Sequence, residues 1–160
     1  MEYNNPSEIV KNLAFGSDAK DKIMHGVDKL ADAVKSTLGA SGKCVIYEDA
    51  MGRPVITKDG VTVAESVVLY DPVENIGATL IKEAAKNTVK EAGDGTTTAT
   101  VLAQALMHLA TTSEESDDVR SLKSGISSAL VKVTEHLQEE AIPVKGDMLR
   151  SVSAISCNND

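Results

Sequence analysis

A run of two glycines around one aspartate, followed by three threonines, divides two apolar stretches of this chain. It reads Gly93-Asp94-Gly95-Thr96-Thr97-Thr98, and the apolar-periodic stretch 99–110 follows directly. A glycine between two apolar-periodic stretches typically ends the first helix. The first backbone N–H groups of the following helix have no intrahelical partner and form the positive end of that helix's dipole. Close backbone approach and hydroxyl donors suit a phosphate, and a Mg²⁺ ion between carboxylate and phosphate would explain Asp94. Alone, the run supports phosphate binding and plain capping by Asp94 or Thr96 about equally.

The remaining patterns predict a mainly α domain with one small β-hairpin. Apolar residues recur at three- and four-residue steps in several stretches, and two short β-branched runs flank the loop 49–53. The predicted helices cover about 17–39, 62–66, 71–93, 96–111, 119–141 and 147–155, and the predicted strands cover 44–48 and 54–58. Ser17 or Asp18 should cap the first helix. Its buried stripe should be Ile23, Met24, Val27, Leu30, Ala31, Val34 and Leu38; that of 71–93 should be Ile76, Leu80, Ile81, Ala84, Ala85, Thr88 and Val89.

Composition narrows the class of protein. The chain has 160 residues with 42 % hydrophobic residues, one Phe and no Trp, so its core must be built from small aliphatic side chains, as in close-packed helices. A net charge of −8 argues against binding a nucleic-acid backbone. Cys44 and Cys157 lack metal-ligand spacing, which favours free thiols in a reducing compartment.

Targeting signals are not evident. No apolar run approaches the roughly 18 residues of a transmembrane helix, and residues 1–6 have neither a basic nor an apolar region. These features predict a soluble cytoplasmic protein, with an organelle matrix as the other option, and no nucleic-acid or membrane partner.

Two further polar corners have unremarkable local explanations. The segment 39–43 differs from a P-loop because only two residues separate its glycines, Cys44 follows Lys43, and the loop comes after a helix. A glycine C-cap is the favoured local interpretation there. Asp59-Gly60 at a strand end usually makes only a turn, although it precedes a helical start. Spacing alone does not determine whether the corners 37–43, 58–60 and 93–98 converge.

Taken together, these corners resemble the group I chaperonins (GroEL type). The resemblance is carried by Thr37-Leu38-Gly39, by Val55-Ile56-Thr57-Lys58-Asp59-Gly60-Val61-Thr62-Val63-Ala64, and by the run from Ala92 to Gln104. Leu30-Ala31-Asp32-Ala33-Val34-Lys35 and Ser153-Ala154-Ile155-Ser156 fit the same pattern, so it extends from about Leu13 to Asp160. The Gly-Asp-Gly-Thr-Thr-Thr run is highly specific, whereas Thr-Leu-Gly alone is weak.

The resemblance implies a double-ring ATPase that folds client proteins with a co-chaperonin. Asp94 would bind Mg²⁺, with K⁺ as a further candidate ion, and Asp59 would position the attacking water or the metal. The other implied ATP-binding residues are Thr37, Leu38, Gly39, Ala40, Lys58, Gly95, Thr96, Thr97 and Thr98. The hairpin 44–57 would pair with a neighbouring subunit of the ring.

Length and one loop depart from the family pattern. Family members usually have Pro-Lys-Gly-Arg-Asn where this chain has Ala40-Ser41-Gly42-Lys43-Cys44, which removes a proline and a lysine donor near the phosphates. Residues 1–141 would be the first half of an equatorial ATPase domain, and 142–160 the start of the intermediate hinge segment. The resemblance thus predicts the N-terminal portion of an ATP-driven chaperonin subunit. A truncated chaperonin-like interaction protein without ATP turnover is the alternative.

Overall fold

The computed structural model describes residues 13–39, 41–112 and 118–156, and its described part is mainly helical with one hairpin, as predicted. The elements are α1 (Gly16–Lys35), β1 (Val45–Glu48), β2 (Pro54–Thr57), α2 (Gly60–Ser66), α3 (Pro72–Ala92), α4 (Thr96–Thr112), α5 (Val119–Glu140) and α6 (Asp147–Ser156). The chain forms two compact units, 1–108 and 109–160. The predicted boundary at 141/142 concerns family domains and stays a prediction.

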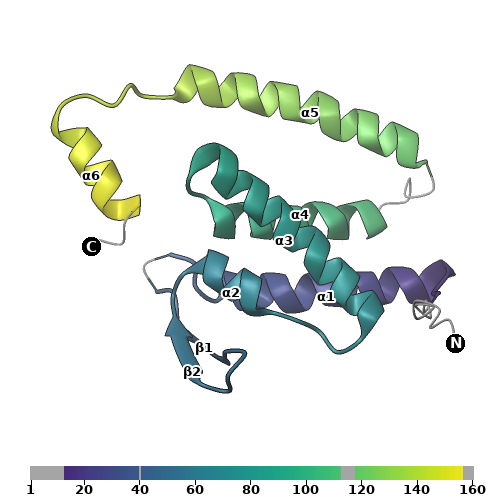
Figure 1. The fold of residues 1–160 in the computed structure, drawn as a ribbon. Helices are drawn as coiled ribbons and strands as arrows, with labels where there is room; N and C mark the ends of the chain where they lie inside the picture. Colours follow the sequence, from purple (N-terminus) through teal and green to yellow (C-terminus); the bar gives the residue numbers. More distant parts are fainter. Residues whose placement is uncertain (1–12, 40, 113–117, 157–160) are drawn as a thin grey trace, which may run out of the picture. The chain divides into compact units, whose positions relative to one another are not determined.

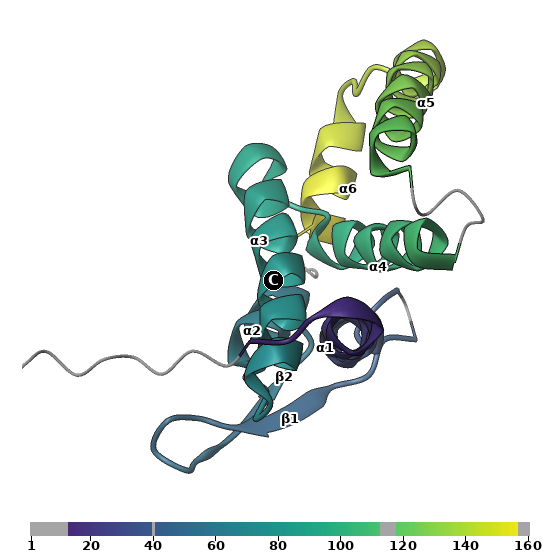
Figure 2. The same cartoon turned by 90° about the vertical axis from the view of Figure 1, so that its right-hand side faces the viewer.

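The first unit is organised around the crossing of α1 and α3 (Figures 1 and 2). Two glycines make this crossing close. A β-carbon on Gly26 would lie 1.8 Å from the carbonyl oxygen of Glu74, and one on Gly77 would lie 2.0 Å from that of Ile23. The backbones therefore touch where neither helix carries a side chain. Beside this contact lies an apolar cluster of Val27, Leu30, Ala78 and Ile81.

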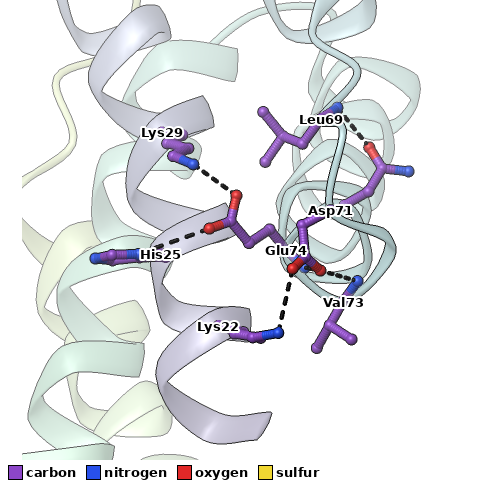
Figure 3. Close-up of polar contacts among 8 residues, drawn as sticks. Lys22, His25, Lys29, Leu69, Asp71, Val73 and Glu74 are labelled. Carbon is purple, nitrogen blue, oxygen red and sulfur yellow. Dashed lines mark hydrogen bonds and ion pairs between the residues drawn. The ribbon is translucent and has the colours of Figure 1, made fainter. Parts of the chain in front are cut away.

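Charged side chains border the same crossing (Figure 3). Glu74 of α3 reaches two residues of α1, with Lys29 Nζ 2.6 Å from Oε2 and His25 Nδ1 3.6 Å from Oε1. Lys22 Nζ lies 3.2 Å from Asp71 Oδ2. Asp71 also caps α3, because its side chain accepts from the N–H groups of residues 73 and 74. These pairs are partly open to solvent and therefore add only modest stability, so the apolar cluster and the glycine contact contribute most to holding the crossing together.

The hairpin forms in the predicted place. β1 and β2 pair antiparallel, with Val45 opposite Thr57 and Glu48 opposite Pro54. Asp49 fixes the connecting loop: its carboxylate accepts from the backbone N–H of Arg53 at 2.9 Å and pairs with the guanidinium at 2.8 Å. The loop therefore depends on contacts within five residues, which explains why the sequence pattern predicted it.

The predicted start, end and buried faces of the helices need correction. α1 begins at Gly16 after Phe15, with no side-chain cap, so neither Ser17 nor Asp18 caps it, and it ends at Lys35, well before Gly39. Leu38, beyond that end, is 48 % exposed. On α3 the buried residues are Val73, Gly77, Ala78, Ile81 and Ala85, whereas Ile76 and Leu80 are about half exposed. The close contact at Gly77 turns the face that contains it toward α1, which the apolar pattern alone did not reveal.

The second unit consists of the end of α4 with α5 and α6. Asp118 caps α5 by accepting from the N–H of Ser121 at 3.1 Å. No described residue of α5 or α6 is buried. Both helices have the predicted amphipathic spacing, and the apolar stripe of α5, including Leu130 and Leu137, is exposed in this structure.

Candidate functional site

Three corners that are distant in sequence meet in the first unit. They are the turn after α1, the start of α2 and the start of α4. Gly60, which is buried, lies at the meeting point: a β-carbon there would lie 2.4 Å from Thr97 Oγ1 and 3.6 Å from Thr37 Oγ1. Thr37, Gly60 and Thr97 are thus neighbours although up to sixty residues separate them. The convergence that spacing could not establish is present.

The start of α4 follows a turn of two left-handed glycines. Gly93 has φ 77° and donates its N–H to Val89 O at 2.8 Å, which ends α3 as predicted. Gly95 has φ 88°, and its N–H donates to Asp94 Oδ1 at 2.6 Å. Side chains other than glycine rarely adopt such φ values, so both glycines are required by the backbone path. The turn holds the Asp94 carboxylate, which is exposed, next to the first N–H groups of α4.

The three threonines of this turn lie in different environments. Thr96 is only 7 % exposed, and its carbonyl accepts from Thr100 Oγ1 at 2.9 Å. Thr97 is half-buried against Gly60, and Thr98 is exposed. Thr97 and Thr98 therefore present the more accessible hydroxyls, and the contribution of Thr96 to a bound anion would come mainly from its backbone.

Asp59 is the N-cap of α2 rather than part of a simple turn at the end of β2. Its Oδ2 accepts from the N–H of Thr62 at 2.8 Å and from Thr62 Oγ1 at 2.5 Å, and its Oδ1 accepts from the N–H of Val61 at 3.3 Å. Burial raises the pKa of this carboxyl, but the hydrogen bonds from Thr62 and Val61 outweigh burial, so the pKa lies below its ordinary value of 3.8. At neutral pH Asp59 is an anion that suits attraction of a cation or orientation of a water molecule.

The turn after α1 folds back onto the end of the helix. Thr37 donates both its N–H, at 3.0 Å, and its hydroxyl, at 2.7 Å, to Val34 O, and Lys43 N–H donates to Ser36 O at 2.8 Å. Gly39 has φ 73° and lies three residues beyond the C-cap Ser36. Gly39 therefore closes the following turn instead of capping α1 directly, which corrects the local interpretation. The exposed Lys58 precedes Asp59, and Ala40 lies outside the described residues.

The donors present fit a metal that is held jointly with a phosphate. Within 13–39, 41–112 and 118–156, no three His, Cys, Asp or Glu side chains gather as a metal site. Mg²⁺ commonly takes only one or two carboxylates and completes its shell with waters and phosphate oxygens. Asp94, exposed beside helix N–H groups that suit a phosphate, matches that requirement. Nothing in these donors distinguishes a K⁺ site.

Two residues that shape the candidate site were not predicted from the sequence. Thr62 binds the Asp59 carboxylate through two donors, and Gly60 allows Thr97 to approach. The Asp-x-x-Thr spacing at the start of a helix is a capping signal that could have indicated Thr62. The role of Gly60 depends on a contact across the fold, which no local pattern contains.

The comparison with known protein families decides the affiliation of the chain. The model of the TCP-1/cpn60 chaperonin family matches residues 30–160. This chain belongs to that family. The predicted resemblance is thereby confirmed, and the mainly helical fold with its hairpin is a partial equatorial-domain fold of chaperonins.

Solved structures agree with the assignment. The chaperonin gp146 from the bacteriophage EL 2 (Pseudomonas aeruginosa), crystallised in the presence of ATP-BeFx, is similar in two crystal forms. In form I the identity is 34 % and the TM-score 0.78, with 91 % of this chain and 26 % of that chain covered. In form II the identity is 31 % and the TM-score 0.71, with 90 % and 28 % covered. This chain thus spans about a quarter of the length of those structures.

None of the helices within residues 13–39, 41–112 and 118–156 combines the length and the apolar character that a membrane crossing needs.

Proposed function

We propose that this chain supplies the first half of the Mg-ATP site of a ring-forming chaperonin subunit that hydrolyses ATP to drive refolding of client proteins. The observation that carries the proposal is the meeting of Thr37, Gly60 and Thr97 beside the N-terminus of α4, with the Asp94 carboxylate at the same turn. A helix N-terminus, hydroxyl donors and an exposed carboxylate are the groups that a metal-bound phosphate requires. The ATP-BeFx in the gp146 crystals supports a nucleotide as the ligand.

Each predicted site residue has a role in this proposal. Asp94 holds the Mg²⁺ ion, and Asp59, kept ionised by its hydrogen bonds, positions the attacking water or the metal. The phosphates are held by Gly95, Thr96, Thr97 and Thr98, and the rest of the nucleotide is contacted by Thr37, Leu38, Gly39, Ala40 and Lys58. Bound Mg²⁺ would neutralise charge on the phosphates, while these residues orient them, and phosphoryl transfer depends mainly on those two effects.

The wider assembly belongs to the same proposal. Residues 1–141 would be the first half of the equatorial domain and 142–160 the start of the intermediate segment. Identical or related subunits would complete the ring in the cytoplasm or an organelle matrix, with clients and a co-chaperonin as further partners. The exposed side chains of Ile46 and Ile56, paired across the hairpin, support its use as a contact between subunits.

A chaperonin-like interaction protein without ATP turnover is the second candidate. The observation that favours it is coverage: the chain spans about a quarter of gp146, and phosphoryl transfer needs a fully assembled pocket. Under this candidate the subunit assembles with others, or interferes with their assembly, while hydrolysis is absent.

Calorimetric titration of the chain with ATP, with and without Mg²⁺, tests the proposal, together with phosphate release and the mass in solution. We expect Mg²⁺-dependent binding that Asp94→Asn abolishes. Asparagine keeps an acceptor for the Gly95 N–H and removes the charge, so the turn should persist. Asp21→Ala removes an exposed carboxylate from α1 and should leave binding unchanged.

The outcomes separate the two candidates. Binding with phosphate release supports the ATPase, and binding or assembly without release supports the interaction protein. A chain that binds no Mg-ATP, or binds it equally well as Asp94→Asn, would refute the nucleotide site.

A further inference from the structure

The C-terminal end of α2 is bound by a lysine from another helix. The ammonium group of Lys82 on α3 donates one hydrogen bond to the carbonyl oxygen of Val67, the C-cap of α2. It donates another to the carbonyl oxygen of Glu65, at 3.4 Å. The last carbonyl groups of a helix have no intrahelical partner and form the negative end of its dipole. A cation at this place therefore satisfies acceptors that α2 cannot satisfy itself.

The surroundings of Lys82 show that this contact is more than a solvated surface pair. The side chain is half-buried, and burial, with the nearby positive charge of Lys86, lowers its pKa, while Glu65 acts in the opposite direction. A partly desolvated ammonium needs hydrogen-bond acceptors. The carbonyl groups at the end of α2 provide them, which fixes the position of that end against α3.

The other end of α2 is part of the candidate site. The helix has seven residues, about 10 Å at 1.5 Å per residue, and begins at Gly60 after its cap Asp59. A rigid rod of two turns transmits a displacement of one end to the other. α3 also leads through Gly93 directly into the turn that begins α4. One helix thus carries both the anchor of α2 and the phosphate-binding turn.

We propose that Lys82 is a positioning residue for the Mg-ATP site, which sets Asp59 and Gly60 against the Gly93–Thr97 turn by anchoring α2 to α3. The inference rests on the proposed function. Val63 and Ala64 of α2 pack with Val34 of α1, so α2 stays attached to the fold without Lys82. Loss of the anchor should therefore shift or loosen α2 rather than unfold the unit.

Three variants of the chain test this role. Lys82→Met removes the ammonium and keeps an unbranched side chain, and Lys82→Arg restores a cation donor. Lys86→Met is the matched control, because it removes the same charge from the next turn of α3 at an exposed position. The readouts are amide hydrogen exchange, measured separately over α1 and α2, and calorimetric titration with Mg-ATP.

We expect Lys82→Met to speed exchange in α2 and to weaken Mg-ATP binding, each about tenfold, since hydrogen bonds to a charged group are lost. Exchange in α1 should stay within about twofold of the unmodified chain, Lys86→Met should resemble that chain, and Lys82→Arg should recover most of both losses. Unchanged α2 exchange or unchanged affinity in Lys82→Met would overturn the proposal. Equal acceleration in α1 and α2 would overturn it too, because Lys82 would then serve general stability.

A failure of the proposed function gives a different pattern. If the unmodified chain binds no Mg-ATP, the nucleotide site and any role of Lys82 in it are refuted together. The exchange measurement then still shows whether Lys82 anchors α2, independently of nucleotide.

Discussion

A single methyl group at the crossing of α1 and α3 should destabilise the first unit. At Gly26 the added β-carbon would meet the carbonyl oxygen of Glu74 at 1.8 Å, and at Gly77 it would meet that of Ile23 at 2.0 Å. Ordinary contact begins at 3.4 Å, so the helices would have to separate by roughly 1.5 Å. The obstacles are backbone atoms within helices or at their start, and rotation of a side chain cannot relieve them.

The magnitude follows from two opposing effects. Overpacking of this kind costs about 1–3 kcal/mol, and a separation of more than 1 Å forfeits much of the contact energy of the adjoining cluster around Val27 and Ile81. Replacing glycine by alanine inside a helix returns about 0.5–1 kcal/mol of conformational entropy. The net expectation for Gly26→Ala or Gly77→Ala is a loss of about 2 kcal/mol in the free energy of unfolding. The double variant should cost less than twice that amount, because one separation relieves both clashes.

Urea unfolding followed by circular dichroism, with hydrogen exchange assigned to each helix, measures this effect. The exchange data are needed because the two compact units can respond separately. Gly125→Ala is the matched control: it lies in α5 with no atom within 4 Å of an added β-carbon. It should stabilise α5 by about 0.5–1 kcal/mol. If Gly26→Ala and Gly77→Ala left exchange in α1 and α3 unchanged or slower, the reasoning about the close crossing would be wrong.

Three further outcomes follow from the site and its surroundings. Thr62→Val removes the hydroxyl that donates to Asp59, so the pKa of the Asp59 carboxyl should rise from its depressed value toward 3.8 or beyond. NMR titration measures this pKa, and an unchanged titration midpoint of Asp59 would contradict the assigned hydrogen bond. Burial raises the pKa of Asp28, but hydrogen bonds from Gln104 and His108 of α4 lower it by a larger amount, so the folded-state pKa lies below 3.8. The stability that Asp28 contributes is therefore present above about pH 3.8 and is lost as pH falls through the lower folded pKa. Acid unfolding at constant ionic strength should show this loss below pH 3.8, and a loss already complete above pH 3.8 would refute the direction of the shift. In Gly60→Ala the added β-carbon would lie 2.4 Å from Thr97 Oγ1, so the threonine would have to move away. Calorimetry should then show Mg-ATP binding weakened about tenfold. If Gly60 were needed only for stability, a variant of unchanged stability would bind Mg-ATP normally.

Local chemistry explains what the sequence predicted correctly. Asp71 before Pro72 begins α3, and Gly93 ends it with a left-handed residue, because caps and φ preferences act within a few positions. The hairpin formed at its predicted place because Asp49 and Arg53 close the loop between its strands. The long motif from Ala92 to Gln104 was specific enough to indicate the chaperonin family, which the family match then confirmed.

The buried faces of the helices depended on longer-range contacts. Ile76 and Leu80 have the spacing of a core stripe, but both are about half exposed, whereas Gly77 and Ala78 are buried. An apolar pattern says that a helix has a face to bury and does not say where a neighbouring backbone will approach. That approach was decided at Gly26 and Gly77, whose small size has no periodic signature.

The candidate site divides in the same way. The residue types that suit a phosphate and a metal are visible in the run from Gly93 to Thr98, and their roles stay predictions. The nearness of Thr37, Gly60 and Thr97, the capping role of Asp59 and the anchor from Lys82 came only from the tertiary structure. The sequence determined the helices and the family because those signals lie within short stretches of chain. Only packing across α1, α2, α3 and α4 determined which of the polar corners meet, because each contact depends on segments that the linear order keeps far apart.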